Sequence, residues 1–261
     1  MDKTNQVQTT SSLISDLKAL GITEGMTLIV HPSLGSIGWI VGGSLALIQA
    51  LQEVLTEEGT LVMPSHSTDL SDPKDWNNPK VNRKLWESIK RDMPGFNSHI
   101  TPTYKLGIVP ELFRNLPNVK RSEHPAYSFS AWGKEKEYIL NNHSLDNGLG
   151  EQSPLARIYD LAGHILLLGT NYDSNTSMHL SEHRVGVFPK TTEGSPVIIK
   201  GKKKWVTYKE IEYDEANFIK IGEAFEKKQK IKVGMVGKAP SKLISQKDLV
   251  DFTTENILRY S

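Results

Sequence analysis

The segment His179-Leu180-Ser181-Glu182-His183 has residue types and spacing with the most direct chemical meaning in this chain. On a helix, His179 and His183 lie one turn apart on a common face, which is the spacing that two zinc-ligating imidazoles need, and Glu182 would then be the base of a zinc hydrolase. A second interpretation needs no metal, because a helical histidine whose tautomer is fixed by a carboxylate can act as a general base. The pattern alone leaves both interpretations open.

In the metal-free interpretation, His183 needs a carboxylate partner. Glu182 adjoins His183 in sequence but points about 100° away around the helix. We therefore expect the partner to come from elsewhere in the chain. Three carboxylates stand near glycine- or proline-marked bends or at a helix start: Asp146, Glu151 and Asp214.

A glycine-rich loop is the second candidate site. Gly35, Gly38, Gly42 and Gly43 lie between an apolar run at 26–30 and a helical pattern at 44–55. Closely spaced glycines let backbone N–H groups approach an anionic or extended ligand beside a helix N-terminus, although a closely packed strand-to-helix turn uses the same residues. The loop matches neither GxGxxG nor GxxxxGK[ST], so we expect neither a dinucleotide fingerprint nor a nucleotide P-loop.

Composition excludes several classes of protein. The 261 residues include no cysteine, and 31 Lys+Arg against 30 Asp+Glu give a formal net charge of +1. A thiol nucleophile and a Cys-ligated metal are therefore excluded, and a large nucleic-acid footprint is not expected. No apolar run approaches the roughly 20 residues that cross a bilayer, and the first residues lack a signal-peptide layout. We expect a cytoplasmic protein with no membrane partner.

Apolar periodicity predicts helices and strands that alternate along the chain. Helices are predicted at 12–20, 44–55, 83–91, 105–116, 135–140, 153–161, 176–184, 214–228 and 245–258, the first capped by Ser11 or Ser12. Strands are predicted at 26–30, 60–63, 127–132, 165–168 and 232–236, with a hairpin at 196–200 and 204–208 around a turn at 201–203. The polar stretch 66–79 is too long for a simple connector and is expected to be a functional or mobile loop.

The order of these elements predicts an α/β fold. The strand, glycine loop, helix and strand between 26 and 63 form a βαβ unit, whose right-handed crossover makes the two strands parallel. The all-apolar run 165–168 is typical of a central strand covered on both sides. We therefore predict one domain, residues 1–261, with a central mixed sheet flanked by helices and an antiparallel hairpin in the C-terminal third. A division near residue 190 is the alternative.

Five motifs carry a family resemblance. They are HPSLGSIGWIVGG at 31–43, TPTYKLG at 101–107, RSEHPAYSFSAWG at 121–133, EQSPLARIYDLAGHILLLG at 151–169 and NTSMHLSEHR at 175–184. In this order they resemble the aminoglycoside N3-acetyltransferase family, and within it the Bacillus-type members. The resemblance implies transfer of an acetyl group from acetyl-CoA to the 3-amino group of a 2-deoxystreptamine aminoglycoside, an antibiotic-resistance reaction, by direct attack and without a metal.

The resemblance also implies site residues. The family's cofactor loop, H-x-S-L-x-x-x-G, corresponds to His31, Pro32, Ser33, Leu34, Gly35, Ser36, Ile37 and Gly38. Thr101 and Thr103 match positions near the cofactor, with Gly107 and Arg114 as weaker candidates. The family's catalytic base corresponds to His183, with Glu182 or another carboxylate to hold its imidazole. Backbone amides of residues 36–38 are candidates for stabilising the oxyanion.

Two alternatives remain beside this assignment. One is the zinc hydrolase described above, and the other is a CoA-binding family member that acts on a different small amine or on none. A polycationic acceptor requires carboxylates gathered in one cleft, for which the loop at 66–78 offers Asp69, Asp72 and Asp75. A homodimer is the base-rate expectation for the oligomeric state.

Overall fold

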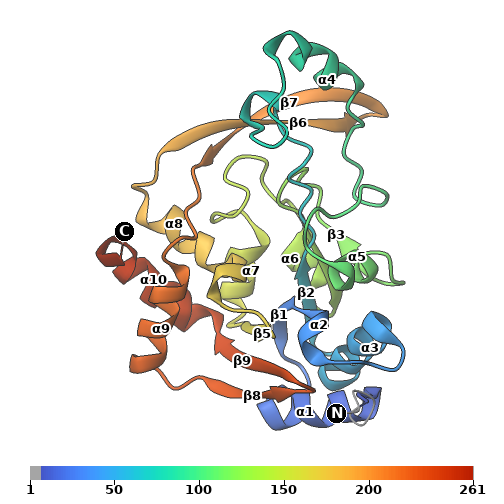
Figure 1. Ribbon diagram of the computed structural model, residues 1–261, viewed down its shortest axis with the longest axis vertical. Coiled ribbons are helices and arrows are strands. Elements are labelled where there is room, and N and C mark those ends of the chain that lie inside the picture. Colours follow the sequence, from blue (N-terminus) through green and yellow to red (C-terminus); the bar gives the residue numbers. More distant parts are fainter. Residues whose placement is uncertain (1–6, 261) are drawn as a thin grey trace.

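Seven strands form one mixed sheet in the order β3-β4-β2-β1-β5-β9-β8 in the computed structural model, which describes residues 7–260 (Figure 1). The three inner strands run parallel: β2 (Thr60–Pro64), β1 (Thr27–Pro32) and β5 (His164–Leu168). The flanking strands pair antiparallel: β3 (Lys120–Arg121), β4 (Phe129–Gly133), β9 (Ala239–Ser245) and β8 (Lys232–Val236). The predicted mixed sheet is confirmed.

Helices cover both faces of the sheet, and each face has its own apolar cluster. The first face is covered by α1 (Thr10–Leu20), α3 (Gly43–Leu55) and α5 (Ile108–Phe113). The second is covered by α6 (Lys136–Leu140), α7 (Pro154–Asp160), α8 (His179–Val185), α9 (Phe218–Lys228) and α10 (Gln246–Tyr260). This two-sided cover explains why the inner strands are apolar along their whole length.

Strand β5 shows how the two clusters are divided. Ile165 and Leu167 belong to the cluster under α7 and α10, whereas Leu166 and Leu168 belong to the cluster under α1 and α3. All four side chains are fully buried. The alternation follows the period of two that strand geometry imposes, and it confirms the expected central strand.

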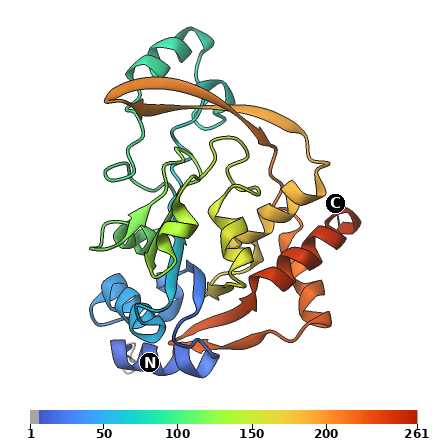
Figure 2. The same cartoon turned by 180° about the vertical axis from the view of Figure 1, so that it is seen from behind.

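A long hairpin stands apart from the sheet. Strands β6 (Lys190–Ile199) and β7 (Lys202–Ile211) arch over one end of the molecule beside α4 (Trp86–Asp92), in both views of the ribbon (Figures 1 and 2). Its turn is Lys200-Gly201, both with positive φ (50° and 73°), as a two-residue turn between twisted strands requires. The prediction of a turn at 201–203 was wrong, because Lys202 and Lys203 already pair within β7.

Several predicted boundaries change for local reasons. Thr9, not Ser11 or Ser12, caps α1, and Ser12 returns the hydrogen bond as its third residue. The helix expected from 105 begins at Ile108, because Lys105 and Gly107 have positive φ. The helix expected from 214 begins at Phe218, because the side chain of Asp214 accepts the Ala216 N–H in a turn. The two strands β3 and β9 were not predicted.

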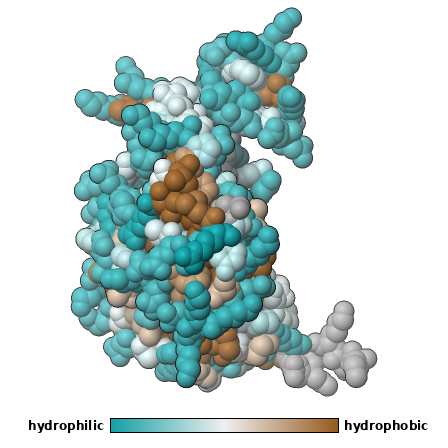
Figure 3. Space-filling model, turned by 90° about the vertical axis from the view of Figure 1, so that its left-hand side faces the viewer, coloured by the Kyte–Doolittle hydropathy of each residue, from teal (hydrophilic) through white to brown (hydrophobic). Residues whose placement is uncertain are grey.

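Short 3₁₀ turns complete the chain. They are η1 (Pro73–Asp75), η2 (Arg83–Leu85) before α4, η3 (Tyr172–Ser174) and η4 (Thr176–Met178) before α8. A single helical turn, α2 (Leu34–Ile37), follows β1. One side of the surface is largely hydrophilic, with a hydrophobic patch at mid-height (Figure 3). Within residues 7–260, no helix has the length and apolar character needed to cross a membrane.

Candidate active site

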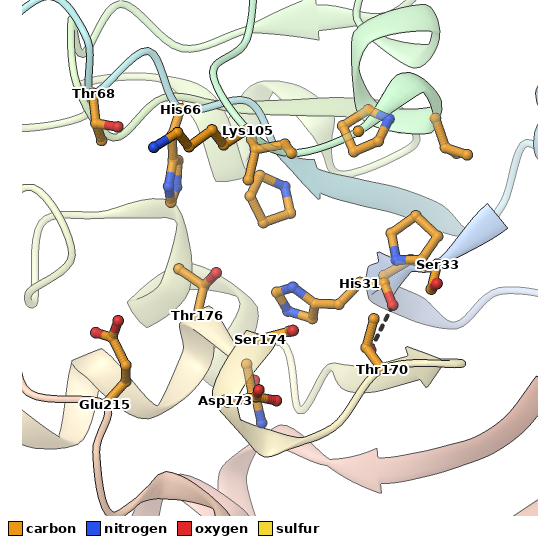
Figure 4. Close-up of a pocket in the computed structure, with 18 of the residues that line it drawn as sticks. His31, Ser33, His66, Thr68, Lys105, Thr170, Asp173, Ser174, Thr176 and Glu215 are labelled. Atoms are coloured by element: carbon orange, nitrogen blue, oxygen red, sulfur yellow. Dashed lines mark hydrogen bonds between the residues drawn. The ribbon is translucent and has the colours of Figure 1, made fainter. Parts of the chain in front are cut away.

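A cavity of about 860 Å³ opens at the carboxyl ends of β1, β2 and β5. Because β1 lies between two parallel neighbours, the chain segments that leave these strands diverge there, which is where open α/β sheets bind ligands. The wall consists of residues 30–35, Pro64, His66, Thr68, residues 105–110, Tyr127, Leu149, Thr170, residues 173–176, His179, Tyr213 and Glu215. Figure 4 shows His31, His66, Lys105 and Glu215 converging from different elements.

His179 and Glu182 form a hydrogen-bonded pair at this cavity. The Nδ1 atom of His179 lies 2.6 Å from Oε2 of Glu182. The carboxylate is fully buried, and its Oε1 accepts the backbone N–H of Asp214 at 2.8 Å. With Nδ1 held as the donor, Nε2 of His179 is the nitrogen that can accept a proton from a molecule in the cavity. The sequence pattern therefore contains a histidine that faces the cavity and, three residues later, the carboxylate that orients its ring.

His183 lies outside the cavity wall. Its Nε2 is 2.9 Å from the hydroxyl of Tyr213 and 3.3 Å from Oε1 of Glu210, and its side chain is 8% exposed. The residues that line the cavity include His179 but not His183. Glu182 thus lies beside the cavity through its hydrogen bond to His179, whereas His183, the base predicted from the sequence, faces Tyr213 and the hairpin residue Glu210.

The three carboxylates proposed as partners of His183 serve other groups. Asp146 accepts the Lys209 N–H, and Glu151 pairs with Arg184. The side chain of Asp214 accepts the Ala216 N–H, and its backbone N–H donates to Glu182. The acidic neighbour of His183 is Glu210, on β7.

Two further histidines line the cavity, and one ring nitrogen of each has no hydrogen-bond partner among residues 7–260. The Nε2 atoms of His31 and His66 are buried without a hydrogen bond. Burial, together with the nearby His179, lowers the pKa of His31 to about 3. Burial, with His179 as the next contributor, lowers the pKa of His66 to about 3 as well. Both imidazoles are therefore neutral at physiological pH and free to hydrogen-bond a ligand.

The predicted cofactor loop lies only partly on the cavity. His31, Pro32, Ser33, Leu34 and Gly35 line it, and Thr170 Oγ1 donates to the His31 carbonyl at 2.9 Å (Figure 4). The rest of the loop turns away. Ser36 bonds to Ser33 and to the Gly169 carbonyl, Ile37 is fully buried, and Gly38 (φ 94°) packs near Lys238.

The TPT turn lies beside the cavity rather than in its wall. Thr103 donates its N–H and its hydroxyl to Glu111, which also pairs with Arg114. The hydroxyl of Thr101 accepts the Asn97 N–H. Gly107, by contrast, lines the cavity, together with Lys105. The two threonine hydroxyls therefore organise the turn that presents Lys105.

A smaller cavity of about 340 Å³ adjoins the first and shares Thr68, Tyr127 and Tyr213 with it. Four carboxylates line it, and its described lining contains no lysine or arginine: Asp72, Asp75, Glu193 and Glu212. Asp72 pairs with Lys90 at 2.7 Å and Asp75 with Lys74 at 3.9 Å, whereas Glu193 and Glu212 form no ion pair within residues 7–260 and give the cavity its negative charge. Of the predicted acidic loop, Asp72 and Asp75 lie here and Asp69 does not. We call this space the acidic cavity.

The two histidines of the zinc interpretation do not converge. His179 directs Nδ1 at Glu182, while His183 directs Nε2 at Tyr213 and Glu210. In the part of the chain that the structure describes, no group of three or more His, Asp or Glu residues is arranged to hold a metal ion.

Several wall residues carry no sequence signal strong enough to single them out. His66 and Thr68 stand in a loop that is expected to be functional, but they belong to no motif of their own. Tyr213 immediately precedes the helix predicted at 214–228, where a wall residue is not expected. The cavity brings together residues that follow β2 and a residue that follows β7, a long-range arrangement that local periodicity does not encode.

Comparisons with known proteins agree with this architecture. A sequence model of the aminoglycoside 3-N-acetyltransferase family matches residues 29–257. The SPbeta prophage-derived aminoglycoside N(3')-acetyltransferase-like protein YokD of Bacillus subtilis is 51% identical over 97% of this chain and 93% of its own length. Aminoglycoside N(3)-acetyltransferase IV of Salmonella sp is 35% identical over 92% of this chain and 84% of its own.

Solved structures of similar proteins have the same fold as this chain. The crystal structure of Bacillus subtilis YokD superposes with a TM-score of 0.95 at 50% identity and covers 97% of this chain and 94% of that one. The binary complex of AAC-IIIb with CoASH has a TM-score of 0.87 at 25% identity, over 98% of each chain. AAC-VIa bound to sisomicin has a TM-score of 0.86 at 26% identity, over 97% of this chain and 98% of that one. The chain therefore belongs to the aminoglycoside 3-N-acetyltransferase family of acetyl-transferring enzymes.

Proposed function

We propose that this protein transfers the acetyl group of acetyl-CoA to the 3-amino group of a 2-deoxystreptamine aminoglycoside, with His179 as the general base. The observation that carries the proposal is the His179–Glu182 pair at a cavity that adjoins a second, carboxylate-lined one. A base and an acidic acceptor site side by side are what acylation of a polycationic amine requires.

His179 replaces His183 as the base in this proposal. When acetyl-CoA is bound, it supplies a thioester. The acceptor amine attacks the thioester carbonyl and loses a proton to Nε2 of His179, the C–N bond forms as the C–S bond breaks, and the proton passes from His179 to the departing thiolate. Glu182 holds the neutral tautomer beforehand and stabilises the imidazolium in between. Such a base contributes about 10²–10⁴-fold to the rate.

Transfer is direct in this scheme. The sequence contains no cysteine, so an acetylated thiol of the enzyme cannot be an intermediate. Without a thiol nucleophile, the simplest scheme brings the amine and the thioester together in a ternary complex. The joined cavities provide room for both molecules at one histidine.

The larger cavity is the proposed site for acetyl-CoA. His31 to Gly35 provide backbone and imidazole groups for the pantetheine arm, and Lys105 is the cation available to a phosphate. The relative AAC-IIIb was crystallised with CoASH, which supports the same ligand here. Five of the predicted cofactor residues support this wall through hydrogen bonds and packing and do not line the cavity themselves: Ser36, Ile37, Gly38, Thr101 and Thr103.

The acidic cavity is the proposed site for the amino sugar. Ammonium groups of the acceptor would pair with Asp75, Glu193 and Glu212. The relative AAC-VIa was crystallised with sisomicin, an aminoglycoside, which supports this class of acceptor. We propose the cytoplasm as the location, since the reaction needs acetyl-CoA.

The test measures release of free thiol from acetyl-CoA with a panel of aminoglycosides and simpler amines. The proposed function predicts turnover with aminoglycosides and loss of at least about 10²-fold in kcat for His179→Ala, with CoA binding by calorimetry retained. Product mass and proton NMR would place the acetyl group on the 3-amino nitrogen. CoA binding without turnover on any amine would favour the non-catalytic alternative, and a tightly bound zinc ion whose removal abolishes activity would favour the hydrolase.

A further inference from the structure

Tyr213 occupies the boundary between the two cavities. It follows β7, and it is among the three residues that line both spaces. Its ring centroid lies 4.7 Å from that of His179 and 5.6 Å from that of Tyr127. An acceptor that reaches from the acidic cavity to His179 must therefore pass the ring of Tyr213.

A buried network fixes the hydroxyl of this tyrosine. The hydroxyl lies 2.9 Å from Nε2 of His183, which is itself 3.3 Å from Oε1 of Glu210. Glu210 is 1% exposed, and its Oε2 accepts the Gly148 N–H at 2.8 Å. All three side chains can be satisfied at once if the Tyr213 hydroxyl and His183 Nε2 both donate toward the carboxylate.

The carboxylate of Glu210 is held in its charged form. Burial alone would raise the pKa of Glu210, but hydrogen bonds from His183, Tyr213 and the Gly148 N–H lower it below its ordinary value. A buried charge of this kind strongly disfavours any arrangement that removes one of its donors. The network therefore gives the Tyr213 ring one preferred orientation.

We propose that Tyr213 selects amino-sugar acceptors, and that His183 and Glu210 are positioning residues that hold its ring between His179 and the acidic cavity. The inference rests on the proposed function. The aromatic face packs against the C–H groups of a sugar ring and attracts an ammonium group. A ring held in place limits the acceptor to poses in which the amine reaches His179, and misplacement by about 1 Å can cost 10²-fold in rate.

The test compares Tyr213→Ala, Tyr213→Phe, His183→Ala and His183→Gln with the wild type. We expect Tyr213→Ala and His183→Ala to raise KM for the aminoglycoside about tenfold or more, with KM for acetyl-CoA changed less than about twofold. Glutamine can donate to Glu210 in place of the imidazole, so His183→Gln is expected to recover most of the acceptor affinity. Tyr159→Phe is the matched control, because this tyrosine donates to Asp251 and lines neither cavity.

The pH profile of kcat separates positioning from catalysis. If His183 positions Tyr213, the acidic limb of the profile persists in His183→Ala, because His179 is still the base. Loss of turnover and of that limb in His183→Ala, with normal behaviour of His179→Ala, would overturn the inference and make His183 the base. If His183→Ala does not fold, as judged by its unfolding curve, the acceptor KM and the pH profile of kcat are compared between Tyr213→Phe, His183→Gln and the wild type instead.

Failure of the inference differs from failure of the proposed function. If the wild type acetylates no aminoglycoside and binds none by calorimetry, the proposed function is wrong and the inference falls with it. If the wild type is active but acceptor KM is unchanged in Tyr213→Ala and His183→Ala, only the inference is overturned.

Discussion

The buried carboxylate of Glu182 joins the Nδ1 atom of His179, 2.6 Å away, to the backbone N–H of Asp214, 2.8 Å away. His179 and Glu182 lie on α8, whereas Asp214 follows the hairpin strand β7. The proposed base is thereby tied through one side chain to the segment that carries Tyr213. Alignment of the base and placement of the acceptor wall depend on the same contact.

Replacing Glu182 by glutamine tests this contact. The amide oxygen can still accept the Nδ1 proton, but the amide NH2 then faces the Asp214 N–H, and the negative charge that stabilises the imidazolium is lost. We therefore expect kcat to fall about 10²–10⁴-fold with little change in KM for acetyl-CoA. The thiol-release assay measures both. Glu151→Gln, which removes an exposed partner of Arg184, is the control. A kcat for Glu182→Gln within about threefold of the wild type would contradict the role assigned to Glu182.

The acidic cavity predicts an effect on acceptor binding alone. Asp75→Asn and Glu212→Gln each remove one exposed carboxylate from its lining, so we expect KM for an aminoglycoside to rise about two- to fivefold for each. Added salt should raise the wild-type KM in the same direction, since it screens exposed charges. Asp160→Asn, on α7 and outside both cavities, should leave KM unchanged. Equal changes in KM for acetyl-CoA would argue against separate sites.

Neutral histidines make stability depend on pH. Burial lowers the pKa of His31 and His66 to about 3 and that of His124 to about 4, against an ordinary value of 6.5. Well above the ordinary histidine pKa, these lowered pKa values do not change the free energy of unfolding, because the imidazoles are neutral in both states. As the pH falls from there toward 4, the imidazoles of the unfolded chain bind protons that the folded chain excludes, and the protein becomes less stable. Each histidine should then reduce the free energy of unfolding by up to about 1.4 kcal/mol per pH unit.

Urea unfolding at about pH 7.5, 6 and 5 measures this slope. His66→Phe removes one titrating ring and its unpaired nitrogen while keeping the edge contacts with Tyr127 and Phe129. The variant should show a shallower dependence on pH below the ordinary histidine pKa. An unchanged slope would mean that His66 is not neutral in the folded protein.

A helix glycine should resist replacement by alanine. At most helix positions this change is stabilising by about 1 kcal/mol, but a Cβ on Gly222 of α9 would overlap the fully buried ring of Tyr172. We expect Gly222→Ala to lower the free energy of unfolding by about 1–3 kcal/mol. Combined with Tyr172→Leu, which makes room, the loss should be less than the sum of the two single changes. Strict additivity would show that the two positions are not in contact.

Local patterns were sufficient for the inner part of the fold. The apolar runs at 26–30 and 60–63 predicted two parallel strands, and the run at 165–168, which has no polar face, predicted a central strand covered on both sides; β1, β2 and β5 form at these positions. Strand β9 was missed, because Ala239–Ser245 contains proline, lysine and two serines and lacks a simple alternation. Its place depends on pairing with β5, a strand from a distant part of the chain.

The site, too, was predicted where it depends on local sequence and missed where it depends on long-range contacts. The pattern at 179–183 correctly brought a histidine and a carboxylate to one helix, but spacing could not decide which imidazole faces the cavity. That choice depends on Glu210 and Tyr213, which the hairpin brings to His183 from a distant part of the chain. The acidic cavity likewise combines the loop at 68–75 with both hairpin strands, so only part of it was visible in the sequence.

The register of the hairpin also sets which charge faces His183. Opposed residues of an antiparallel pair share a face, and Glu193 pairs with Tyr208 while Thr191 pairs with Glu210. A one-residue insertion in β7 before Tyr208 would turn every following side chain to the opposite face. Lys209 would then take the place of Glu210, and a lysine would stand where a buried carboxylate now faces His183. The register that a remote two-residue turn fixes is thus a constraint on how the side chains around His183 and Tyr213 are held.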